Sequence, residues 1–196
     1  MKNILIILTI LLIPASVYLQ ENHDSLVEDA NSYLSALEKR DVQKLLRYVY
    51  LPGNDQFRLE ELQQTFERVF NDTTLVTSYS RGTIVKASES IEVDHLKYRT
   101  VFFTIQLNLS LPEWQESSLS LEILRSQYGD HNVIYNSKEH LITVKIIDYL
   151  YAIKPEQSKQ WKFLAGNSTS WSDDLIPQNV IDYFAVEIIS WISNRI

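Results

Sequence analysis

The chain of 196 residues contains no cysteine. This absence excludes disulfide bonds, a thiolate nucleophile, cysteine-based zinc sites and lipid attachment to an N-terminal cysteine. Neither an HExxH motif nor a G-x-S-x-G turn occurs, and no nucleotide-binding loop is present. The four histidines also lack a metal-ligand spacing: His23, His95, His131 and His140. The sequence therefore predicts no metal, no cofactor and no catalytic serine.

Positive charge is in short supply. The chain has 18 Lys and Arg against 25 Asp and Glu, which gives a formal net charge of −7. Nucleic-acid binding requires clustered cations, and the densest basic patch is the pair Lys39 and Arg40. A nucleic-acid partner is therefore excluded. Aromatic residues are plentiful, with eleven Tyr, seven Phe and four Trp, and they fit a well-filled core or an aromatic-lined pocket.

Long hydrophobic runs are absent as well. The longest, Ile4 to Ile13, follows the positive Lys2 and is broken by Pro14. A bilayer-spanning helix needs about 20 apolar residues, so this segment is typical of a secretory signal. We expect residues 1–20 to be a signal peptide or a short anchor, and residues 21–196 to form one domain. The predicted location is periplasmic, extracellular or N-terminally anchored, with membrane contact only through the N-terminal segment.

The mature chain places helices before strands. Apolar residues at three- and four-residue spacing predict helices over 25–40, 42–49 and 57–70. Strict alternation from Val101 to Leu111 predicts a strand with one buried and one wet face. The later segments are a strand region at 83–93, a helix at 118–128 before Gly129, a hairpin of 133–135 with 141–153, a strand at 160–164, and a helix capped by Asp173 or Asp174 with Pro177 in its first turn. This order indicates an α+β fold with a mostly antiparallel sheet.

Three stretches carry a family resemblance: DANSYLSALEKRDVQKLLRYVYLP (29–52), YGDHNVIYNSKEHLITVKIIDYLYAIKPEQSKQWKFL (128–164) and LIPQNVIDYF (175–184). Together they resemble nuclear transport factor 2-like domains, in particular small exported bacterial members. The resemblance implies N-terminal helices packed on a strongly bent, mostly antiparallel sheet, which gives a cone with an interior pocket. Members of this superfamily include ketosteroid-isomerase-like and polyketide-cyclase-like enzymes, scaffold dimers and exported domains. The chain departs from the enzymes because it lacks a recognisable placement of their acid–base residues, and the helix at 118–128 is an insertion.

Asp148 is the main candidate for a functional side chain. It occupies an even-numbered position of the predicted strand, as do the apolar residues Ile142, Val144, Ile146, Leu150 and Ala152, so it is expected on the same face. A regular strand would turn this carboxylate toward the buried face, where desolvation raises a pKa and suits general acid–base chemistry. Two alternatives stay open. A β-bulge near Ile146 and Ile147 would turn Asp148 outward, and burial with a satisfying hydrogen bond would leave it without chemistry.

Two aromatic residues near the C-terminal strands are the other candidates for ligand binding. Trp161 is expected to share a face with Phe163, and Tyr149 with Tyr151. Such cross-strand pairs stabilise a sheet without a ligand, so a purely structural role is the alternative. The candidate ligand-binding residues are thus Asp148, Tyr149 and Trp161.

These features predict a non-catalytic exported domain that binds a small apolar molecule or a partner protein through a cone pocket or a sheet face. One alternative is an acid–base isomerase or cyclase in which Asp148 is catalytic. Another is a structural subunit of an envelope assembly, which would form a homodimer through its sheet. The sequence favours the non-catalytic hypothesis because no catalytic constellation is recognisable.

Overall fold

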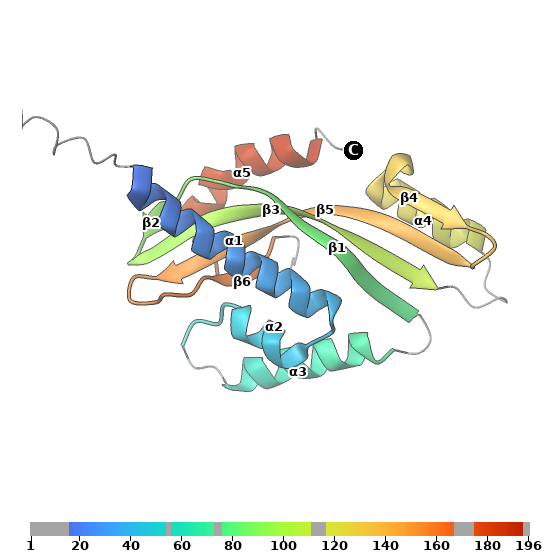
Figure 1. The fold of residues 1–196 in the computed structure, drawn as a ribbon, viewed down its shortest axis with the longest axis horizontal. Coiled ribbons are helices and arrows are strands. Elements are labelled where there is room, and N and C mark those ends of the chain that lie inside the picture. The colour runs from blue at the N-terminus through green and yellow to red at the C-terminus, as the bar shows by residue number, and fades with distance from the viewer. Residues whose placement is uncertain (1–15, 54–55, 73–75, 111–116, 167–174, 194–196) are drawn as a thin grey trace, which may run out of the picture.

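The computed structural model describes residues 16–53, 56–72, 76–110, 117–166 and 175–193. Within these ranges the chain forms five α-helices, a single 3₁₀ turn and a six-stranded sheet (Figure 1). In chain order the elements are α1 (Ser16–Glu38), α2 (Val42–Tyr48), α3 (Gln56–Phe70), β1 (Val76–Ala87), β2 (Ile91–Val93), β3 (Leu96–Ser110), α4 (Ser117–Tyr128), η1 (Asp130–Asn132), β4 (Val133–Asn136), β5 (Leu141–Pro155), β6 (Lys162–Ala165) and α5 (Gln178–Ser193). The α+β class predicted from the sequence is confirmed.

The sheet is built on the long antiparallel pair β3 and β5, which runs from Leu96 opposite Pro155 to Ser110 opposite Leu141. Strand β1 pairs with β3 on one side and β4 pairs with β5 on the other, both antiparallel. The short strands β2 and β6 continue these two edges, on β3 and β5 respectively. Two register shifts interrupt β1, and such irregularities bend a strand and increase its twist.

Helices cover both faces of this sheet. Helix α1 packs on one face, and the core there consists of Leu26, Ala30, Leu34, Val101, Phe103, Ile105, Leu150, Ala152, Trp161 and Phe163. Helix α5 packs on the other, where the core consists of Tyr98, Phe102, Tyr149, Tyr151, Ile153, Leu164, Ile176, Val180, Phe184, Ile188 and Trp191. Helices α2 and α3 lie together next to α1 and far from α5 (Figure 1). The two faces of β3 therefore belong to two different hydrophobic cores.

Because helices cover both faces of the sheet, the prediction that β3 has one solvent-exposed face is wrong. Thr100 and Phe102 point away from α1, yet both are fully buried because α5 closes over this part of the strand. Farther along the strand the polar residues of the same face are only half-buried. The alternation of apolar and polar residues correctly predicted the face of β3 that is buried under α1, since Val101, Phe103 and Ile105 are all buried there. A strand pattern alone does not reveal a helix that arrives from the end of the chain.

Local signals place several element ends where the sequence predicts them. The Asp41 side chain accepts a hydrogen bond of 2.9 Å from the Lys44 N–H and caps α2. Gly129 follows α4 with a φ of 85°, a conformation that glycine adopts without strain. The helix at 57–70 and the hairpin of β4 with β5 are also confirmed.

Other boundaries differ from the predictions. Helix α1 begins at Ser16, inside the predicted signal segment, and the expected strand region at 83–93 is divided between β1 and β2. The carbonyl of Pro177 accepts from the Val180 N–H at 2.9 Å, so this proline precedes α5 instead of lying in its first turn. Asp173 and Asp174, the expected caps, lie outside the described residues, as do residues 1–15.

None of the helices in the described ranges is both long enough and apolar enough to span a bilayer.

Candidate functional site

Asp148 lies in the middle of β5, on the face of the sheet that α1 covers. It is opposite Phe103 on β3, and the register of the two strands continues without a shift on either side. The carboxylate therefore keeps the parity of its apolar neighbours, and the side chain is half-buried. Its Oδ1 accepts a hydrogen bond of 2.8 Å from the Tyr149 N–H.

Two tyrosines, Tyr33 and Tyr128, feel the charge of this carboxylate, and a third, Tyr79, interacts with both of them. Burial raises the pKa of Tyr33, on α1, to about 12, and the nearby charges of Asp148 and Tyr79 add to the shift. Burial and then Asp148 raise the pKa of Tyr128, at the end of α4. Burial and then Tyr128 raise the pKa of Tyr79, on β1. The phenols thus stay protonated at neutral pH and are suited to hydrogen bonding with a polar group on this face.

Tyr149 lies on the opposite side of the sheet from Asp148. Its hydroxyl donates to the Gly166 carbonyl at 2.9 Å, and its ring packs in the core beneath α5. The expected pairing of Tyr149 with Tyr151 on one face is confirmed, with ring centroids 5.5 Å apart. The sheet therefore separates Tyr149 from Asp148, although both are predicted to bind a ligand.

Trp161 immediately precedes β6 and packs under α1 together with Phe163, as predicted. Its backbone N–H donates to Asp29 Oδ2 at 2.9 Å, and the Lys154 ammonium lies 5.5 Å from its ring. With only 3% of its surface exposed, the side chain contributes to the core beneath α1. In this position Trp161 stabilises the attachment of α1 to the last strand.

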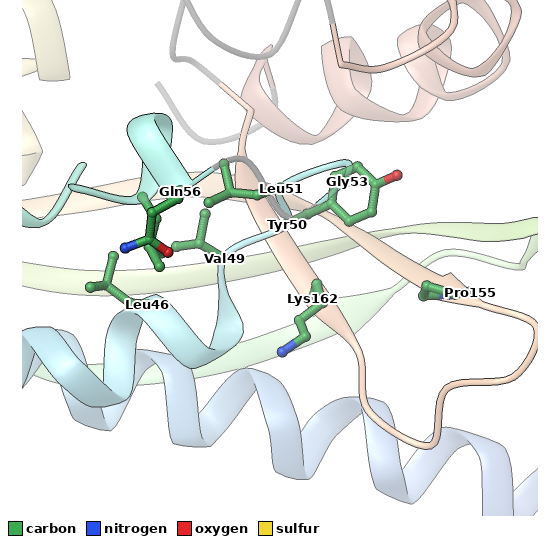
Figure 2. A pocket seen from close by; sticks show the side chains of 9 residues that line it. Leu46, Val49, Tyr50, Leu51, Gly53, Gln56, Pro155 and Lys162 are labelled. Carbon is green, nitrogen blue, oxygen red and sulfur yellow. The ribbon is translucent and has the colours of Figure 1, made fainter. Parts of the chain in front are cut away.

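A cleft opens elsewhere, between the α2–α3 connection and the ends of β5 and β6. Its volume is about 490 Å³, within the range of roughly 300–1,000 Å³ usual for small-molecule pockets. Figure 2 shows Pro155 and Lys162, from the two strands, across from the residues of the helical side. The lining consists of Leu46, Val49, Tyr50, Leu51, Gly53, Gln56, Leu59, Pro155 and Lys162.

The chain segment after α2 gives this cleft its shape. Val49 forms a parallel bridge with Phe163, and the Tyr50 N–H donates to the Phe163 carbonyl at 3.0 Å. These contacts hold the segment against β6. Gly53 then adopts a φ of 67°, in the left-handed region that glycine favours, so the chain can turn away toward α3. Leu51 and Gly53 of this segment thus line one wall of the cleft.

Lys162 is the cationic residue among the nine that line the cleft. Its ammonium donates to Gln160 Oε1 at 3.1 Å and to the Arg47 carbonyl at the end of α2. Partial burial lowers the pKa of Lys162, and the more distant charge of Asp29 opposes that shift. Among the residues that the structure describes, no carboxylate oxygen lies within 4 Å of this ammonium.

None of the three residues predicted as ligand-binding lines the cleft. Asp148 and Trp161 lie under α1 and Tyr149 lies under α5, whereas the cleft lies where β5 ends and β6 begins. The sequence does not reveal that the segment before Leu51 meets β6, because the parallel bridge of Val49 with Phe163 joins segments far apart in the chain. The sequence did contain one indication of this site, because Lys162 stands between two aromatic residues that are buried in the structure.

The described ranges contain no group of three or more His, Asp or Glu side chains that could hold a metal ion.

Comparisons with known proteins leave the family open. No protein-family model matches the chain. Human E3 ubiquitin-protein ligase HECW1 is similar, with 28% identity over 138 residues, which cover 66% of this chain but only 8% of that protein. A crystal structure of a conserved protein from Planctomyces limnophilus DSM 3776 is also similar. It has a TM-score of 0.33 and 14% identity, and the match covers 74% of this chain and 91% of that chain.

Proposed function

We propose that the protein is a non-catalytic binding module that takes a small, mainly apolar ligand into the cleft between the α2–α3 connection and β6. One observation carries the proposal: a cleft of about 490 Å³ whose walls are mostly aliphatic and aromatic side chains. Pockets of this size and character are the usual form of ligand sites. The absence of a recognisable catalytic motif from the sequence supports a binding role.

Burial of apolar surface supplies the driving force. Removing apolar surface from water is worth roughly 25 cal/mol per Å². Drug-sized ligands reach about 0.3 kcal/mol per non-hydrogen atom in a well-matched pocket. At that efficiency a ligand of about 14 such atoms would bind with about 4 kcal/mol, which corresponds to a Kd of about 1 mM. This value sets the concentration range for a binding assay.

The test uses N-phenyl-1-naphthylamine, an uncharged fluorophore whose emission rises in apolar surroundings. The wild type should bind it saturably. Leu46→Trp and Leu59→Trp each place an indole in the cleft and should weaken binding at least about tenfold, since the ligand and the indole compete for one volume. Ile123→Trp is the matched control, because this residue is 56% exposed on α4 and does not line the cleft. Equal binding by all four proteins would refute the proposed site.

Asp148 supports a second candidate function, an acid–base isomerase or cyclase. The favouring observation is a half-buried carboxylate near phenols of raised pKa on a helix-covered face. Such a carboxylate can remove a proton next to a ketone while a phenol stabilises the enolate. Proton NMR of cyclic ketones in D₂O measures this exchange. Catalysed exchange that is lost in Asp148→Asn would support the enzymatic function. Exchange no faster than in buffer alone would refute it.

Export is the remaining part of the proposal. Residues 1–20 should direct the chain across a membrane, as expected of a positive start followed by a short apolar run. Cell fractionation should find the protein outside the cytoplasm. Accumulation of the full-length chain in the soluble cytoplasmic fraction would contradict this prediction. Dimerisation through the sheet stays a separate hypothesis, which sedimentation analysis would test.

A further inference from the structure

The charge of the cleft is unbalanced. Among the residues that the structure describes, which exclude 54 and 55, the lining contains Lys162 as a cation, Gln56 as an uncharged amide and no acidic residue; the other seven are Leu46, Val49, Tyr50, Leu51, Gly53, Leu59 and Pro155. A ligand that was purely apolar would leave the ammonium facing an apolar molecule. Burying a charge beside apolar groups is costly unless an opposite charge or hydrogen-bond acceptor meets it. The lining thus favours a ligand with two different ends.

The environment of Lys162 leaves room for an anion. An ammonium group has three N–H donors. Within the described part of the chain its acceptors are two uncharged oxygens, from Gln160 and from the Arg47 backbone. Asp29 is the acidic residue that acts on it over a longer range, and one Asp29 oxygen already accepts from the Trp161 N–H. Its positive charge is therefore partly desolvated, and no carboxylate of the described residues lies close to it.

Resting on the function proposed above, we infer that the ligand of this cleft is an amphipathic carboxylate, a short fatty-acid-like molecule. The hydrocarbon tail lies on the apolar wall formed by residues such as Leu46 and Leu59. The carboxylate accepts a charge-assisted hydrogen bond from Lys162. Charge complementarity then selects the anion over an alcohol or amine with the same tail.

The acidity of the whole chain does not remove this preference. A net charge of −7 repels anions at long range and slows their approach. At physiological ionic strength, however, charges separated by more than about 8 Å are largely screened. A contact at hydrogen-bond distance from a half-buried ammonium is screened much less. Lys162 therefore determines the preference at the site, while the net charge affects the association rate.

Lys162 also has a structural role that the test must separate from binding. Its contact with the Arg47 carbonyl places a cation at the C-terminal end of α2, which stabilises the helix. A purely structural lysine would change the stability of the protein when it is replaced. It would not change the relative affinities of ligands that differ only in their head group.

The experiment measures displacement of N-phenyl-1-naphthylamine by decanoate, decanol and decylamine, which share one tail. In the wild type, decanoate should displace the probe at a concentration about tenfold lower than decanol, as one charge-assisted hydrogen bond predicts. Decylamine should be the weakest. Raising the ionic strength from about 0.05 M to about 0.5 M should reduce the advantage of decanoate, since salt screens the ammonium.

Variants assign the preference to one residue. Lys162→Met keeps the apolar stem and should remove the advantage of decanoate while decanol binds as before. Lys162→Arg should retain it. Lys159→Met is the matched control, because it removes the same charge from an exposed residue of the β5–β6 turn that does not line the cleft. If Lys162→Met fails to fold, the salt dependence of the decanoate preference in the wild type and in Lys162→Arg still tests the inference.

Failure of this inference is distinguishable from failure of the proposed function. Equal displacement by decanoate and decanol would refute the preference for a carboxylate head group. It would still support the binding of an apolar ligand in the cleft. A decanoate preference that persists in Lys162→Met would overturn the assignment to Lys162. If no amphiphile displaces the probe, and Leu46→Trp does not weaken probe binding, the proposed function fails together with this inference.

Discussion

Replacing Phe102 by alanine should destabilise the protein by about 4 kcal/mol. The side chain is 0% exposed and lies on the face of β3 that α5 covers. Its ring centroid is 5.1 Å from that of Trp191 and 6.4 Å from that of Tyr149. The Lys86 ammonium lies 4.6 Å from the same centroid. Phe102 thus connects the central strand, the neighbouring strands and the C-terminal helix.

The magnitude follows from the area and the contacts that are lost. A buried aromatic side chain removes about 150–250 Å² from water, worth roughly 4–6 kcal/mol at 25 cal/mol per Å². This sum is an upper limit, because the unfolded chain already buries part of that area. Measured Phe→Ala changes in protein cores cost about 3–5 kcal/mol. The exposed side of Lys86 limits its cation–π contribution to about 0.5–1 kcal/mol.

Urea unfolding followed by tryptophan fluorescence measures the loss, with Gln106→Ala as the control. Gln106 points to the same side of β3 as Phe102 but is only half-buried, and its replacement should cost less than about 1 kcal/mol. Ile105→Ala, on the α1 face, should cost about 2–5 kcal/mol. Equal losses at Phe102 and Gln106 would show that α5 does not cover the strand, and the two-core description would be wrong.

Two further predictions concern close contacts of β5. Gly166→Ala would place a Cβ 2.1 Å from the Tyr149 ring, so the ring must move, and the change should cost about 1–3 kcal/mol in urea unfolding; an unchanged midpoint would show that the contact is not tight. Asp148→Asn should lower the pKa of Tyr33 from about 12, though not to 10.0, because burial is the larger cause of the shift. The stabilisation from the neutral Tyr33 phenol is complete below about pH 10 and is lost as pH rises toward about 12, so Asp148→Asn should move this loss to lower pH. Ultraviolet titration of the tyrosines measures the pKa, and an unchanged value would place Asp148 too far from Tyr33 to interact.

The candidate sites show how far sequence patterns reach. Parity along β5 correctly predicted the face of Asp148, because side chains alternate strictly in a regular strand. It did not predict the two phenols near that carboxylate, since they come from α1 and α4. Parity also implied that Tyr149 faces away from Asp148, although both were expected to bind a ligand. The cleft was not predicted at all.

The sequence by itself determined the helices, the strands and most of their ends. Apolar spacing, the Asp41 cap and Gly129 act over a few residues, and a short stretch of chain contains all the information they need. The α+β order also follows from the sequence, because it depends only on the succession of these elements along the chain.

The tertiary structure decided which surfaces those elements cover. Phe102 is buried only because α5, nearly eighty positions later in the chain, packs over β3. The cleft exists only because Val49 meets Phe163, which brings the α2–α3 connection against Lys162. Neither contact leaves a local pattern, since burial depends on the segment that closes over a residue and each closing segment is distant along the chain. Local periodicity determines which side of an element is apolar, and packing determines what that side meets.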